Sequence, residues 1–181
     1  MRLTGLFLAL SLVSLSVSAQ PAMPRKAPEI TIVEPSGKQT LLSSYKGKVV
    51  ALAFVSTACS HCQAECQLLT KLQGELGPKG FQPLAVAFIE STPPQVEGFV
   101  RNFHIGFPVG YAARQTVLDY LQLSDADTGW KIPQMVLIDR KGMIVAQSAS
   151  QGSPELQEES SLRMKITDLL SGGAAKKKSG L

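Results

Sequence analysis

Apolar residues fall along this chain in two kinds of run, one continuous and one at helical spacing. Residues 49–55 are apolar at every position, which is typical of a strand buried on both faces of a sheet. Residues 63–76 instead carry leucines that recur every three or four positions, which predicts an amphipathic helix: Leu68, Leu69, Leu72 and Leu76. A buried strand is therefore expected to lead, through residues 56–62, directly into a helix.

The same patterns divide the rest of the chain into strands and helices. Residues 35–38 contain turn-forming residues between two short runs, 29–33 and 39–42, and predict a small hairpin. Further strands are expected at 82–89, 134–139 and 143–149, a short extended piece at 107–110, and helices at 95–103, 114–121 and 154–170. No internal repeat is visible, so we expect one domain, at residues 29–170.

The first residues have the pattern of an export signal. Arg2 precedes a short apolar run at residues 6–17, and Val17-Ser18-Ala19 meets the small-residue rule for signal peptidase. The run is shorter than the roughly 20 residues that a membrane span needs. We expect a cleaved signal peptide at 1–19, with an uncleaved N-terminal membrane anchor as the alternative. The protein is then exported to the periplasm or another extracytoplasmic compartment, where disulfides persist.

Two flanking segments complete the predicted organisation. Residues 20–28 form a proline-rich leader, and residues 171–181 form a basic tail that contains Lys176-Lys177-Lys178 and is expected to be disordered. The formal net charge of +4 is too small and too scattered to indicate a nucleic-acid partner.

The junction between the buried strand and the helix holds Cys59-Ser60-His61-Cys62. Free amide groups and the dipole at a helix N-terminus stabilise a thiolate at the first cysteine, and a Cys-x-x-Cys at a strand-to-helix turn is a redox signature. Zinc would need four ligands, and no second such pair exists. Haem attachment would need histidine where Gln63 stands. A purely structural disulfide would close a very short loop and stabilise little. We expect no metal and no cofactor other than a redox-active Cys59–Cys62 disulfide.

Several segments together resemble the thioredoxin superfamily, in its exported TlpA/ResA-like and redoxin (AhpC/TSA) branch. They are Ala27-Pro28-Glu29-Ile30, the lead-in at residues 43–50, the Cys59–Cys62 motif, and Ile132-Pro133 before residues 135–142. The resemblance covers roughly residues 27 to 170. It implies an α/β, thioredoxin-like fold, with a central mixed β-sheet flanked by helices and an N-terminal β-hairpin extension.

The motif and the resemblance assign roles to the cysteines and their neighbours. Cys59 is the expected nucleophile and Cys62 the resolving cysteine of thiol–disulfide exchange. A cationic His61 would favour the Cys59 thiolate and tune the redox potential, although an exposed polar spacer is an equal interpretation. The match to ResA-like proteins implies that Glu65 assists proton transfer, against the alternative of an ordinary first-turn glutamate.

Pro133 resembles the superfamily's cis-proline, and Ile132 precedes it. Together they would bind substrate in an extended manner beside the cysteines. The alternative is a trans proline that begins an edge strand.

Two positions depart from the family pattern. Ala58 stands where tryptophan usually precedes the first cysteine, and Cys66 is an additional thiol. Two helical turns, about 10 Å along the axis, separate Cys59 from Cys66, so they cannot form a disulfide without unwinding. We expect Cys66 to be a buried helix residue that stays free when Cys59 and Cys62 are oxidised. The alternative is that this odd thiol of an exported protein pairs elsewhere.

The sequence thus predicts an exported thiol–disulfide oxidoreductase that exchanges disulfides with protein thiols, as a monomer supplied by a membrane redox partner. A redoxin-type thiol peroxidase is the alternative, although Ser56 replaces the threonine of the peroxidase motif and the strand before it has no proline. A copper-binding chaperone of the SCO kind fits less well, because it needs wider cysteine spacing and a distant histidine.

Overall fold

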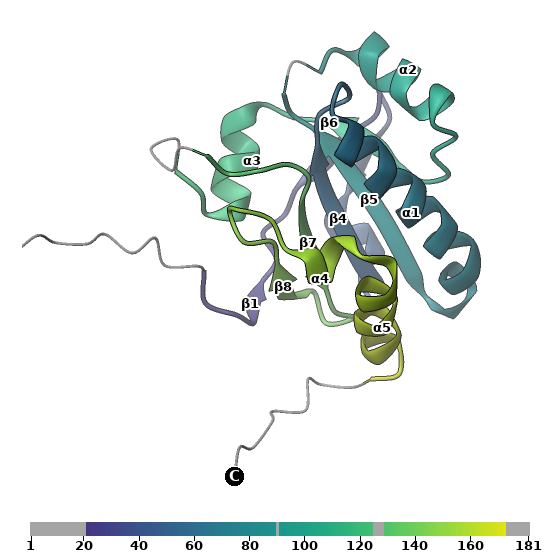
Figure 1. Cartoon of the computed structure of the whole chain (residues 1–181), viewed down its shortest axis with the longest axis vertical. Coiled ribbons are helices and arrows are strands. Elements are labelled where there is room, and N and C mark those ends of the chain that lie inside the picture. Colours follow the sequence, from purple (N-terminus) through teal and green to yellow (C-terminus); the bar gives the residue numbers. More distant parts are fainter. Residues whose placement is uncertain (1–20, 90, 125–128, 173–181) are drawn as a thin grey trace, which may run out of the picture.

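A mixed β-sheet lies at the centre of the molecule (Figure 1). The structure is a computed structural model that describes residues 21–89, 91–124 and 129–172. Within these residues the sheet has eight strands, in the order β1-β8-β7-β4-β5-β6-β2-β3. Their bounds are β1 Arg25–Lys26, β2 Thr31–Val33, β3 Gln39–Leu41, β4 Val49–Val55, β5 Phe81–Ala87, β6 Val109–Tyr111, β7 Gln134–Ile138 and β8 Met143–Gln147. The predicted mixed sheet and the N-terminal hairpin, formed by β2 and β3, are confirmed.

The strand β4 occupies a central position and is buried along its whole length. It pairs in parallel with β5 and antiparallel with β7. Alternate side chains of β4 enter different cores, since Val49, Ala51 and Ala53 join one cluster while Leu52 and Phe54 join the other. The continuous apolar run is therefore explained by burial on both faces.

Helices cover both faces of the sheet. They are α1 (Ser60–Leu76), α2 (Pro93–Asn102), α3 (Arg114–Leu121), α4 (Pro154–Gln157) and α5 (Glu159–Leu170), with short 3₁₀ turns η1 (Leu42–Tyr45) and η2 (Gly77–Lys79). Side chains of α1, α2, α4 and α5 belong to one core cluster, and those of α3 belong to the other. Figure 1 shows α1, α2 and α5 on one side of the sheet and α3 on the opposite side.

The C-terminal segment 154–170 was expected to form one helix, and the structure shows two. It is divided into α4 and α5 by Glu158, whose backbone is extended at φ −80° and ψ 129°. Leu156 and Leu162 are both buried. Six residues in a continuous helix would point them about 120° apart, so the interruption allows both to face the same core.

The N-terminal boundary also differs. The sequence predicts a leader without strands at residues 20–28, whereas Arg25 and Lys26 form β1, which pairs with β8 at one edge of the sheet. The predicted signal peptide lies outside the described residues, as does the tail beyond residue 172. No helix among the described residues is long and apolar enough to cross a membrane.

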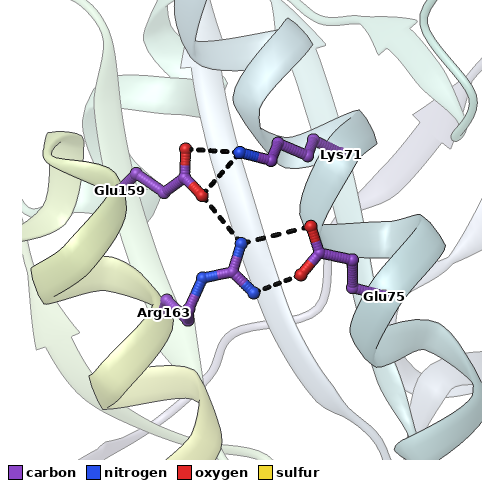
Figure 2. A network of polar contacts seen from close by, with 4 residues as sticks. All are labelled: Lys71, Glu75, Glu159 and Arg163. Atoms are coloured by element: carbon purple, nitrogen blue, oxygen red, sulfur yellow. Dashed lines mark hydrogen bonds and ion pairs between the residues drawn. The ribbon is translucent and has the colours of Figure 1, made fainter.

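A network of charged side chains joins α1 to α5 (Figure 2). Glu159 lies 2.7 Å from both Lys71 Nζ and Arg163 Nη2, and Arg163 also pairs with Glu75. A hydrogen bond from Arg163 holds the pKa of Glu75 below its ordinary value. A hydrogen bond from Lys71 does the same for the pKa of Glu159. Because these side chains are partly exposed, we interpret the network as fixing the register of the two helices more than as a large source of stability.

Candidate active site

Cys59 is the N-cap residue of α1, immediately after the turn that follows β4. Its amide donates to the Ser56 carbonyl at 3.2 Å, and its Sγ accepts a hydrogen bond from the Cys62 amide at 3.4 Å. The helix begins at Ser60, three residues before the predicted start, so the first turn includes Cys62. A half-exposed sulfur that receives a helix-terminal N–H is placed to react as a thiolate.

Cys62 lies beneath Cys59, with none of its surface exposed. Burial raises the pKa of its thiol above the ordinary value, and a hydrogen bond with Cys59 raises it further. The two cysteines therefore differ in accessibility, and burial disfavours the thiolate of Cys62. This difference suits an outer sulfur that attacks a substrate and an inner sulfur that acts after losing its proton.

Cys66 is also fully buried, one helical turn beyond Cys62. Burial raises the pKa of this thiol as well, and the nearby Glu65 contributes in the same direction. All three cysteines are free thiols in this structure. The prediction that Cys66 is a buried helix residue is confirmed.

Glu65 is the charged residue closest in sequence to the inner thiols. Its side chain is only 4% exposed, and burial raises its pKa from 4.5 to about 8. Its Oε1 atom is buried without a hydrogen-bond partner. Beside the buried Cys66 thiol, the neutral carboxyl can donate a proton below this pKa, and the carboxylate can accept one above it.

The Ile132–Pro133 peptide bond is cis, as predicted. The following residue, Gln134, begins β7 opposite Phe54 of β4, so this loop lies at the same end of the sheet as Cys59. The buried Gln134 amide donates to the carbonyls of Lys131 at 2.6 Å and Ala149 at 3.2 Å. These bonds fix the loop in place, whereas a substrate-binding role for Ile132 and Pro133 stays a prediction.

His61 is exposed on the first turn of α1, two residues after Cys59. This position agrees with both interpretations of the residue, a tuning cation and a solvated spacer. Within the described residues, no group of three or more histidine, cysteine, aspartate or glutamate side chains is arranged to hold a metal ion.

An aromatic stack at this end of the sheet was not predicted from the sequence. Trp130 stacks on Phe88 with 5.6 Å between ring centroids, and the Arg114 guanidinium lies 4.9 Å from the Trp130 ring centre. The Phe88 amide donates to the carbonyl of Val55, the last residue of β4. The available signal was that Trp130, the single tryptophan of the chain, stands three residues before Pro133.

The exposure of the three cysteines makes a prediction about alkylation. In the reduced, folded protein, Cys59 should react with iodoacetamide about a hundredfold faster than Cys62 or Cys66, because only its sulfur is both accessible and held at the helix terminus. Mass spectrometry of peptides after brief labelling measures the three rates. In denaturant the rates should converge, which serves as the control. First labelling at Cys66 in the folded protein would contradict the assignment.

The fold and the cysteine pair define a class, the thioredoxin-like thiol–disulfide oxidoreductases. The sequence pattern of the AhpC/TSA family matches residues 23–147. The chain therefore belongs to that family.

Individual proteins similar to the chain agree with this class. It is 25% identical over 135 residues to "Thiol-disulfide oxidoreductase ResA" of Bacillus thuringiensis, covering 75% of this chain and 74% of that protein. It is 30% identical over 122 residues to "Thioredoxin-like protein YneN" of Bacillus subtilis, covering 66% and 67%. The solution structure of a putative protein disulfide isomerase from Bacteroides thetaiotaomicron superposes with a TM-score of 0.69 at 28% identity, covering 83% and 91%.

Proposed function

We propose that this protein is an exported oxidoreductase that exchanges disulfides with protein thiols through Cys59 and Cys62. The observation that carries the proposal is the pairing of a half-exposed Cys59 at the N-terminus of α1 with a fully buried Cys62, whose amide donates to the Cys59 sulfur. The export pattern at residues 1–19 supports the extracytoplasmic location.

In the reductive direction, the Cys59 thiolate attacks one sulfur of a substrate disulfide. A mixed disulfide forms, and the other substrate sulfur leaves as a thiolate. Cys62 then attacks the Cys59 sulfur, which releases the second substrate sulfur and forms the Cys59–Cys62 disulfide. Two electrons pass from the protein to the substrate, and the oxidative direction is the reverse.

Proton transfer is the difficult part of the second step, because burial raises the pKa of the Cys62 thiol. In our proposal, ionised Glu65 accepts that proton. Its buried carboxyl, with one unpartnered oxygen and a pKa of about 8, supports this role. The backbone beside Pro133 holds an extended substrate segment, and a cationic His61 favours the Cys59 thiolate.

The test compares two reactions of the purified protein. With dithiothreitol as electron donor, it should accelerate reduction of the interchain disulfides of insulin, followed by turbidity, and oxidised protein should restore disulfides in a reduced dithiol substrate. Consumption of hydrogen peroxide with the same donor should not exceed that of a variant lacking Cys59. Peroxide consumption without any disulfide exchange would instead favour the thiol-peroxidase alternative.

A further inference from the structure

A hollow of about 530 Å³ lies at the end of the sheet opposite Cys59. Its lining includes Lys48 and Val50 from the beginning of β4 and Ile138 from the end of β7. Cys59 follows the other end of β4. In Figure 1, β1 lies at the lower left and α1 lies across the sheet from it, at the right. The hollow is therefore not part of the candidate active site.

Four exposed lysines line the hollow: Lys26 of β1, Lys46 and Lys48 before β4, and Lys141 in the turn between β7 and β8. The two carboxylates of the lining are already bonded to backbone amides. Glu29 accepts from the amides of Ile30 and Ser43, at 3.2 and 3.1 Å. Asp139 accepts from the amides of Lys141 and Met143, at 2.8 and 2.9 Å. Cations thus outnumber anions, and the anions have partners.

Two further cations adjoin the lining. The Arg140 carbonyl accepts from the Gly47 amide at 3.1 Å, and the Arg140 guanidinium donates to the Lys79 carbonyl at 3.2 Å. We call the six residues Lys26, Lys46, Lys48, Lys79, Arg140 and Lys141 the basic end. The end of α5 reaches the same region, because a Cβ placed on Gly80 would lie 3.6 Å from Arg140 Nη2 and 3.9 Å from Leu170 Cδ2. The last turn of α5 also brings one acid, Asp168.

Both terminal segments of the chain connect to the described structure near the basic end. The apolar run at 6–17 stops eight residues before Arg25, so an extended chain keeps it within about 28 Å of β1. Lys176-Lys177-Lys178 begins six residues after Leu170, within about 21 Å of the end of α5. Cationic sequence is therefore tethered to the face that already carries the lysines, and an apolar run is tethered there too when residues 1–19 are retained as the N-terminal anchor.

We propose that the basic end binds the anionic lipid headgroups of a membrane surface. Lysines around an open hollow complement headgroup phosphates, and the tethered lysine run adds to the attraction. In this orientation Cys59 and the Pro133 loop face away from the bilayer, toward substrate proteins. The binding uses no redox chemistry, so it stands or falls independently of the proposed exchange activity.

The experiment measures co-sedimentation of the full chain with two kinds of vesicle, phosphatidylcholine alone and phosphatidylcholine with 30% phosphatidylglycerol. The expected result is stronger binding to the anionic vesicles, which 0.5 M salt removes. The variant Lys46→Gln/Lys141→Gln should bind anionic vesicles about 25-fold more weakly, at roughly fivefold for each lysine. The control Arg101→Gln/Lys165→Gln removes the same charge from α2 and α5 and should lose less than threefold.

Three outcomes would overturn the proposal. Equal, salt-insensitive binding to both vesicles would mean that the apolar run alone attaches the chain. An equal loss in the control variant would mean that only net charge matters. Abolition of anionic vesicle binding by millimolar inorganic phosphate at constant ionic strength would indicate a small-anion site instead. Because each outcome is read from vesicle binding, insulin reduction by the same preparations reports separately on the proposed function.

Discussion

Replacing Cys59 with serine should reduce thiol–disulfide exchange about a thousandfold or more. A serine hydroxyl is not ionised at neutral pH, so the substituted side chain cannot attack a substrate disulfide. Cys62 cannot take its place, because no part of Cys62 is exposed to a protein substrate. The measurement is the initial rate of insulin reduction at saturating dithiothreitol.

Two matched variants sharpen this result. Cys62→Ser retains the nucleophile and lacks the resolving sulfur, so it should accumulate a mixed disulfide with substrate that is visible on non-reducing gels. Cys66→Ser removes a buried thiol that the reaction does not use and should keep exchange within about twofold of the wild-type rate. Strong loss of activity in Cys66→Ser, with unchanged thermal unfolding, would require a mechanism that includes the third cysteine.

Glu65→Gln should remove most of the pH dependence of stability between pH 5 and 8. The pKa of Glu65 is raised from 4.5 to about 8 by burial, so the folded protein holds this proton more tightly than the unfolded chain does. The stabilisation is therefore fully present below pH 4.5 and is lost progressively as the pH rises through about 8. At pH 7 the loss amounts to about 3 kcal/mol, at 1.36 kcal/mol for each pH unit above 4.5.

Urea unfolding at pH 5 and pH 8, followed by the fluorescence of Trp130, measures this difference. The wild-type unfolding free energy should fall steeply relative to that of Glu65→Gln, which carries a neutral side chain of nearly the same shape. Glu97→Gln, at an exposed glutamate of α2, is the control and should change stability by less than about 0.5 kcal/mol at either pH. Parallel pH profiles for wild type and Glu65→Gln would show that Glu65 is ionised in the folded protein.

Much of the fold follows from local sequence patterns. The strand β4 and the helix α3 have the predicted bounds. An uninterrupted apolar run marks the ends of a buried strand, and a clear amphipathic period marks the ends of a helix. The strand β1 was missed, since two polar residues in a proline-containing segment carry no strand signal. Its pairing with β8 depends on a segment more than a hundred residues away.

The candidate site was located by sequence more completely than it was characterised. The Cys59–Cys62 motif and Pro133 lie at the same end of the sheet, as the sequence indicated. The burial of Glu65 was not predictable, because a first-turn glutamate is as often exposed and only tertiary packing decides. The stacking of Trp130 was also not predictable, because its partner Phe88 follows β5, far from Trp130 in the sequence.

The order of the strands also constrains how this protein matures. Synthesis proceeds from the N-terminus, so β4 and all three cysteines emerge long before β7, the strand that completes the centre of the sheet. The core around Cys62 and Cys66 also includes Met135, Leu156 and Ile166. These three residues are synthesised well after α1, which carries the two cysteines. During synthesis the three thiols are therefore unprotected, and any of them is open to premature oxidation. Reliable production of the Cys59–Cys62 pair depends on the nascent chain staying reduced until its final third has folded onto β4.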